Sequence, residues 1–131
     1  MPEPRFRFVC APSALSGTPV GWAREMLEEG EVALLGFEGL GAVNGLAHDL
    51  GQTAIALVRA EDTPERQDET VIAYARALPL IWVADAFSEP VQAWARDRGP
   101  MTLLTAATGP LDEEERRRID RFVQILGPQS E

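Results

Sequence analysis

The chain has 131 residues, of which 45% are hydrophobic and 25% are charged, so it can form one globular domain with a real hydrophobic core. Its formal net charge is −9 and all twelve basic residues are arginine, which argues against DNA, RNA or an anionic membrane as a partner. The absence of lysine excludes Schiff-base chemistry and a Walker-type phosphate lysine.

The cysteine and histidine content limits the chemistry further. One cysteine and one histidine exclude a Cys/His zinc site within one chain, and no internal disulfide can form. The N-terminal sequence MPEPRFRF lacks a signal-peptide pattern, and no apolar stretch is long enough to span a membrane. We therefore expect a cytoplasmic protein without a metal or another cofactor.

The first part of the chain predicts a strand and a helix joined by a loop. Phe6 to Cys10 is predicted to be the first strand, and residues 11–17 form the loop. Thr18 is predicted to cap the following helix, with Pro19 at its first position and Gly30 at its end. The apolar stripe of this helix consists of Trp22, Ala23, Met26 and Leu27.

The stretch from Val32 to Val58 predicts a strand–helix–strand unit. Val32 to Gly36 and Thr53 to Val58 are apolar throughout, as in parallel strands that are buried on both faces. Gly51 supplies a stop for the helix between them. The stripe of that helix is Val43, Leu46, Ala47 and Leu50.

The turn of this unit carries three glycines in G-x-x-G-x-G order. Gly36, Gly39 and Gly41 would let the backbone approach a ligand, and the following helix N-terminus offers free N–H groups to an anion. Tight packing of helix on strand is the alternative explanation. The charge of Glu38 within the turn would repel a phosphate, whereas a ribose hydroxyl would tolerate it.

The second half of the chain repeats the alternation of strands and helices. Thr63 and Ser88 are predicted to cap the third and fourth helices, and Leu80 to Ala84 and Met101 to Thr105 are predicted strands. Acidic residues 112–115 open the last helix, in which Glu113–Arg117 and Glu114–Arg118 pairs are expected on a solvated face. Gly127 and Pro128 are predicted to end it.

Five strands alternating with five helices predict one doubly wound α/β domain over residues 1–131, with residues 1–4 and 128–131 as tails. The expected strand order is 2-1-3-4-5 or the related 3-2-1-4-5. In either order, ligands bind at the carboxyl ends of the strands, near the switch point. Function is therefore expected in the loops Ala11–Thr18, Gly36–Gly41, Arg59–Thr63 and Asp85–Ser88.

Hydroxyl and glycine residues in two of these loops are the candidate ligand site. The first loop runs into a helix N-terminus, where a phosphate or carboxylate could bind, and Asp85 could hydrogen-bond a ribose. Ordinary capping is the alternative for both. The predicted ligand-binding residues are Ser13, Ser16, Gly17, Thr18, Gly36, Glu38, Gly39, Gly41 and Asp85.

Several catalytic arrangements are excluded or disfavoured. Cys10 lies where a low-molecular-weight tyrosine phosphatase carries its nucleophile, but Ser16 replaces the arginine of the C-x5-R-S pattern, so a buried structural cysteine is expected. A response-regulator receiver requires a lysine that this chain lacks. His48 falls off the apolar stripe and is expected at the surface.

Residues of the central unit follow a layout seen in known nucleotide-binding proteins. Gly41-Ala42-Val43, Ala47, Gly51, Ile55 and Leu57 fit a glycine-rich turn of the form G-G-G-x-x-G-x-M-G-A-V-A, a helix ending in glycine and an apolar strand. In this respect residues 6–58 resemble the Rossmann superfamily that includes the LOG cytokinin-activating phosphoribohydrolases and DNA-processing protein A. The resemblance implies a Rossmann-like fold and a nucleotide-like ligand.

The family's catalytic motif has no counterpart here. Where LOG-type proteins carry P-G-G-x-G-T-x-x-E after the fourth strand, this chain reads ADAFSEPVQAW, and Ala33-Leu34-Leu35 replaces the triple glycine. The resemblance therefore does not extend to hydrolase activity. The chain also resembles Toll/interleukin-receptor-like domains in its element count and in Trp22, Leu27 and Gly30 of a W-x4-L-x2-G pattern.

Three functional hypotheses follow from these observations. The leading one is a domain that binds a nucleotide or another phosphorylated small molecule at the strand ends. The second is an interaction or regulatory module with a degenerate site, which acts through a protein partner or as a homodimer. The third is a nucleoside or nucleotide hydrolase or transferase that uses Asp85, Glu61 or Asp62.

Overall fold

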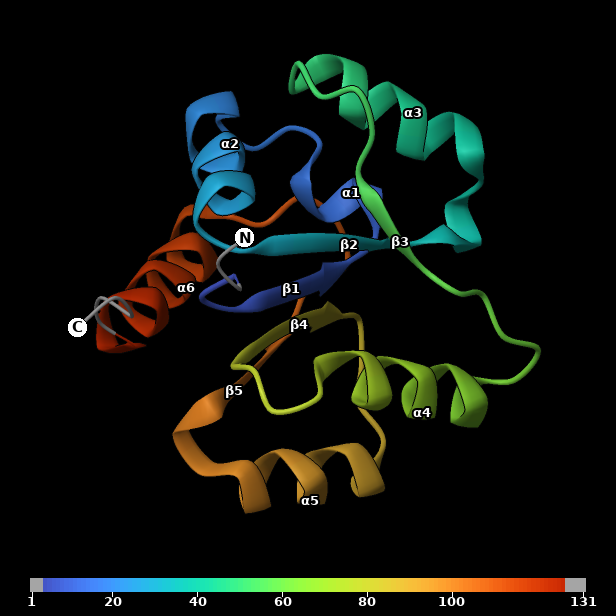
Figure 1. The fold of residues 1–131 in the computed structure, drawn as a ribbon, viewed down its shortest axis with the longest axis vertical. Helices are drawn as coiled ribbons and strands as arrows, with labels where there is room; N and C mark the ends of the chain where they lie inside the picture. The colour runs from blue at the N-terminus through green and yellow to red at the C-terminus, as the bar shows by residue number, and fades with distance from the viewer. Residues whose placement is uncertain (1–3, 127–131) are drawn as a thin grey trace.

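The computed structural model describes residues 4–126, and Figure 1 shows their fold. Of the predicted tails, residues 1–4 and 128–131, only Pro4 lies within the described part of the chain. The elements in chain order are β1 (Arg7–Cys10), α1 (Pro12–Leu15), α2 (Val20–Glu29), β2 (Glu31–Leu35), the 3₁₀ helix η1 (Gly36–Glu38), α3 (Leu40–Asp49), β3 (Ala56–Val58), α4 (Pro64–Ala75), β4 (Leu80–Ala84), α5 (Glu89–Arg98), the 3₁₀ helix η2 (Gly99–Met101), β5 (Thr102–Ala106) and α6 (Glu113–Leu126).

All five strands are parallel, and their order across the sheet is β3-β2-β1-β4-β5. This order confirms the predicted doubly wound α/β fold and selects 3-2-1-4-5 from the two expected orders. The central strand β1 is paired on both sides, with Phe8 opposite Val32 of β2 and Ile81 of β4. Winding reverses direction between β1 and β4, so the loops after these two strands diverge at the carboxyl edge.

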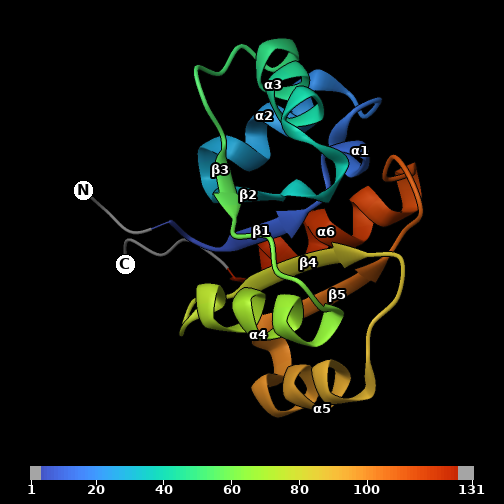
Figure 2. The same ribbon diagram turned by 90° about the vertical axis from the view of Figure 1, so that its right-hand side faces the viewer.

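The helices form one layer on each face of the sheet (Figure 2). Helices α1, α2, α3 and α6 cover a core that includes Phe8 and Ile81, whereas α4 and α5 cover a core that includes Val9 and Trp82. Because neighbouring strand residues point to opposite faces, the continuous apolar runs of the sequence supply both cores. Right-handed crossovers place α2 and α3 on one face and, after winding reverses, α4 and α5 on the other.

The edge strand β3 is shorter and more exposed than predicted. The sequence predicts a strand from Thr53 to Val58 that is buried on both faces, but β3 spans Ala56–Val58 and exposes Ala56 and Leu57. Within the described chain, β3 pairs only with β2. The prediction failed because a short apolar run does not reveal whether a strand lies at the centre or at the edge of a sheet.

Two of the predicted helix caps are confirmed and one is wrong. The hydroxyls of Thr63 and Ser88 accept hydrogen bonds from the backbone N–H groups of Arg66, at 3.2 Å, and Val91, at 3.4 Å. Helix α2 begins only at Val20, and the Thr18 hydroxyl donates instead to the carbonyl of Leu15, at 2.5 Å. The extra turn α1 explains this correction, because it provides a carbonyl acceptor within reach.

Helix α6 shows the cleanest local signals. Asp112 and Glu115 form a reciprocal capping box, with hydrogen bonds of 2.8 and 2.9 Å between each side chain and the other residue's N–H. The predicted Glu113–Arg117 pair is present at 3.0 Å, whereas the predicted Glu114–Arg118 pair is not formed. Exposed charge pairs of this kind contribute little, so the helix is held mainly by its buried stripe.

Arg76 ends α4 with a φ of 52°, the one positive φ among the non-glycine residues that the structure describes. A side chain at such a φ is crowded by its own backbone. We expect Arg76→Gly to raise the free energy of unfolding by about 1 kcal/mol, measured by urea denaturation. Ala73→Gly, on the exposed side of α4, is the control and should lose about 1 kcal/mol. A loss in both variants would contradict strain at Arg76.

Candidate functional site

A cleft of about 220 Å³ opens at the carboxyl edge of the sheet. It lies at the point where β1 and β4 diverge, which is where open α/β sheets bind ligands. Loops after four strands contribute to its wall. The lining residues are Ala11, Ser13 and Ala14 after β1, Leu35, Phe37 and Glu38 from β2 and η1, Val83, Ala84 and Asp85 from the end of β4, and Ala107, Thr108 and Gly109 after β5.

Glu38 joins the loops that follow β1 and β2. Its Oε1 accepts a hydrogen bond from the backbone N–H of Ser13 at 3.1 Å, and its Oε2 accepts one from the Ser13 hydroxyl at 2.6 Å. The carboxylate therefore occupies the N–H and the hydroxyl of Ser13, one of the residues predicted to bind a ligand. Because both oxygens are engaged, Glu38 fixes the shape of the cleft as well as its charge.

Asp85 is the first residue after β4 and is exposed. It forms no hydrogen bond or ion pair within residues 4–126, so its carboxylate is free to receive a donor from a ligand. The loop that carries Asp85 is anchored to β4, because the Phe87 ring packs edge-on against the Trp82 ring, with the two ring centroids 5.5 Å apart. The Trp82 ring in turn packs edge-on against the ring of Trp94 in α5, with the two ring centroids 6.5 Å apart.

Phe37 stands at the rim of the cleft with 74% of its surface exposed. Sequence reasoning missed it, together with Thr108 and Gly109 of the loop after β5. Phe37 lies within the glycine turn, and an aromatic residue flanked by glycine and acidic residues has no role in packing a helix on a strand. The position of Phe37 between Gly36 and Glu38 was therefore the signal that could have identified it as a site residue. Thr108 and Gly109 carried no comparable signal, because strand order alone brings their loop to the cleft.

The cleft is acidic. Its lining contains the carboxylates of Glu38 and Asp85 and no arginine. Negative charge in a partly enclosed space repels a phosphate and favours groups that donate hydrogen bonds, such as hydroxyls and amines. The arrangement can bind and orient a hydroxyl-rich ring, with an aromatic surface at one side.

The structure brings together three of the nine predicted site residues, namely Ser13, Glu38 and Asp85. The other six do not line the cleft. Ser16 and Gly17 are exposed between α1 and α2, and Thr18 is buried. Gly36, Gly39 and Gly41 shape the turn into α3, where Gly39 has a φ of 98° that only glycine adopts without strain.

In the loop Arg59–Thr63, the Glu61 carboxylate is engaged in hydrogen bonds within the protein. The Glu61 carboxylate accepts from the Thr70 hydroxyl at 2.7 Å and from Arg59 Nε at 2.8 Å. These bonds lower the pKa of Glu61, the contribution of Thr70 being the larger. Neither Glu61 nor the exposed Asp62 lines the cleft, so of the three acids considered for catalysis only Asp85 does.

Cys10 and His48 have the environments predicted for them. Cys10 is fully buried at the end of β1, and burial, followed by the nearby charge of Glu38, raises the pKa of its thiol well above the usual range. The thiol stays protonated and out of reach, so it is not a nucleophile in the folded protein. His48 is exposed on α3. Residues 4–126 contain no group of three His, Cys, Asp or Glu side chains placed to hold a metal ion.

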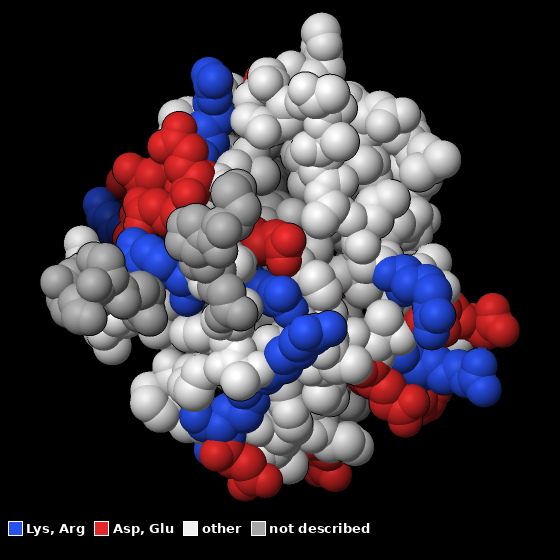
Figure 3. Space-filling view, viewed as in Figure 1, with Lys and Arg blue, Asp and Glu red and all other residues white. Residues whose placement is uncertain are grey.

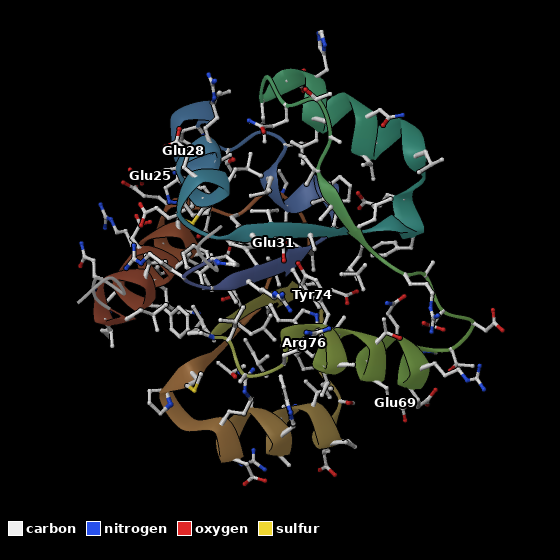
Figure 4. All side chains as sticks on the ribbon, viewed as in Figure 1. Glu25, Glu28, Glu31, Glu69, Tyr74 and Arg76 are labelled. Carbon is white, nitrogen blue, oxygen red and sulfur yellow. The ribbon has the colours of Figure 1, made fainter. Side chains whose placement is uncertain are left out.

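A second polar cluster lies at the opposite, amino-terminal edge of the sheet, where Figure 4 shows Glu31 and Tyr74 close together. The Tyr74 hydroxyl donates to Glu31 Oε1 at 2.6 Å, and Arg7 Nε lies 3.2 Å from the same oxygen. Arg7 also donates to the Tyr74 carbonyl. Burial, and then Glu31, raises the pKa of Tyr74. These contacts link the amino-terminal ends of β1 and β2 to the end of α4.

No helix in the described part of the chain is both long and apolar enough to cross a membrane. Comparison of the sequence with protein-family models and curated proteins, and of the structure with solved structures, found no significant match. The cleft itself is therefore the basis for assigning a function.

Proposed function

We propose that the protein binds a nucleotide-like small molecule in the cleft between the ends of β1 and β4, through its sugar and base. The proposal is carried by the lining, in which the free carboxylate of Asp85 and the exposed ring of Phe37 border the same 220 Å³ space. A ribose offers paired hydroxyl donors to a carboxylate, and a base offers a flat face to an aromatic ring.

The same lining favours a nucleoside over a nucleotide, because it offers no cationic group that would bind the phosphate. A phosphate would need a cation or free N–H groups, but Glu38 already accepts from the Ser13 N–H and no arginine lines the cleft. We therefore place any phosphate of the ligand outside the cleft and assign binding to the uncharged part of the molecule. The strand order 3-2-1-4-5 and the resemblance of residues 6–58 to LOG-type proteins both support a nucleotide-like ligand.

A thermal-shift screen tests the proposal with the four common nucleosides, their monophosphates, ribose and inorganic phosphate. A nucleoside at one hundred times its dissociation constant should add about 2.7 kcal/mol of stability and raise the midpoint by several degrees. Each monophosphate should bind no more tightly than its nucleoside, and inorganic phosphate should produce no shift. An absence of any shift across the panel would contradict the proposal.

Asp85→Asn and Phe37→Ala assign the binding to this cleft. Each should weaken the nucleoside about tenfold or more, because one removes a charged acceptor and the other a stacking surface. Asp62→Asn, an exposed acid outside the cleft, is the matched control and should bind as the wild type does. Unchanged binding in both cleft variants would place the ligand elsewhere. If the bound nucleoside is also cleaved and Asp85→Asn abolishes turnover, Asp85 acts in catalysis as well.

A further inference from the structure

One side of the molecule is almost free of charge. Residues 39–58, which contain α3 and β3, include one charged residue, Asp49, in a chain that is 25% charged. In Figure 3 the surface over α3 and β3 is therefore white, whereas the blue and red charged side chains of that face lie mainly over the other elements. In a protein with a net charge of −9, such a surface is the natural place for contact with another acidic molecule.

The strand at this surface has an unused edge. β3 pairs only with β2 among the described residues and lies at the free edge of the sheet in Figure 2. The outward backbone N–H and C=O groups of such a strand can pair with another strand unless charges, proline or covering elements prevent it. Residues 51–58 contain no charged residue and no proline. Among the described residues the opposite edge strand, β5, likewise pairs with a single strand, β4, and it contacts α5 and α6.

The side chains around this edge are small or apolar. Leu57 is opposite Leu34 in the register, which places it on the face that carries α3, and 46% of its surface is exposed. Ala56 is exposed beside it and allows close approach of a second backbone. Leu57 therefore provides apolar area next to the free backbone groups of β3.

We infer that β3 pairs with β3 of a second copy of this chain, antiparallel and about a twofold axis, so that the two sheets become continuous. A twofold axis makes one patch its own partner, and an uncharged patch can face its own copy without setting like charges against each other. Two copies that each carry a charge of −9 repel each other, and the local repulsion is smallest where such a patch faces its own copy. The cleft is complete within one chain, so this inference is independent of the proposed ligand.

Sedimentation velocity over a range of concentrations tests the pairing. The wild type should dimerise, and Leu57→Glu should weaken the dimer about a hundredfold, because it sets two like charges against each other across the axis. Ile125→Glu on α6, where Ile125 is 69% exposed, is the matched control and should leave the dimer unchanged. An equimolar mixture of Leu57→Glu with Leu57→Arg should restore a dimer through opposite charges.

Circular dichroism checks that each variant folds. Hydrogen exchange of the wild type is an independent test that does not depend on the folding of any variant. In the wild type, hydrogen exchange of the Ala56–Val58 amides should slow as concentration rises. A wild type that is monomeric at every concentration overturns the inference. So does a dimer that Leu57→Glu leaves intact, because such a dimer would use another surface. Nucleoside binding should be retained in the Leu57→Glu monomer.

Discussion

Gly30→Ala is expected to lower the free energy of unfolding by about 3 kcal/mol or more, which is a large share of the stability of a domain of this size. A Cβ atom at position 30 would lie 2.3 Å from Cε1 and 2.5 Å from Cδ1 of Phe6. The Phe6 ring cannot move aside, because it is fully buried and its carbonyl accepts from Glu31 N–H at 2.9 Å. Urea denaturation of the two proteins measures the loss.

Gly21→Ala is the matched control for this prediction. Gly21 lies in α2, and a Cβ built there meets no atom within 4 Å. Alanine should therefore raise the unfolding free energy by about 0.5 kcal/mol through its better helix propensity. A Phe6→Leu substitution added to Gly30→Ala should recover part of the loss, since it removes the clashing ring atoms. Equal stability of Gly30→Ala and the wild type would show that the ring can move.

Trp82→Ala is expected to cost about 4 kcal/mol of unfolding free energy and also to weaken the cleft. Trp82 is 3% exposed at the centre of β4, and it contacts Phe87 and Trp94 edge-on. Its removal leaves a cavity under α5 and releases the loop that presents Asp85. Calorimetry or urea denaturation measures the stability loss, and the nucleoside titration measures the effect on the ligand.

Two further substitutions separate these effects. Phe87→Ala removes the contact between the Asp85 loop and Trp82 while β4 and α5 stay packed, so it should weaken ligand binding more than stability. Trp94→Ala should lower stability by less than Trp82→Ala, because Trp94 is only partly buried. If Phe87→Ala and Trp94→Ala change binding equally, the loop is not held by Phe87.

The candidate site was only partly accessible to sequence reasoning. Asp85 could be identified because it directly follows a buried strand, and strand ends gather at one edge of a parallel sheet. Glu38 was recognised as a poor neighbour for phosphate, but its hydrogen bonds to Ser13 join residues 25 positions apart. The sequence provides no means of finding such a pair, because the two loops meet only after β1 and β2 have paired.

Local signals along the chain were enough to determine the alternation of strands and helices, the two helix caps at Thr63 and Ser88, and the doubly wound fold. These features follow from apolar spacing and from hydroxyl residues at helix starts, which act within a few residues. Strand order, the exposure of β3 and the composition of the cleft were decided only by the tertiary structure. They depend on which strands pair and on the face each helix covers, and those are long-range choices that the same local pattern allows in more than one way.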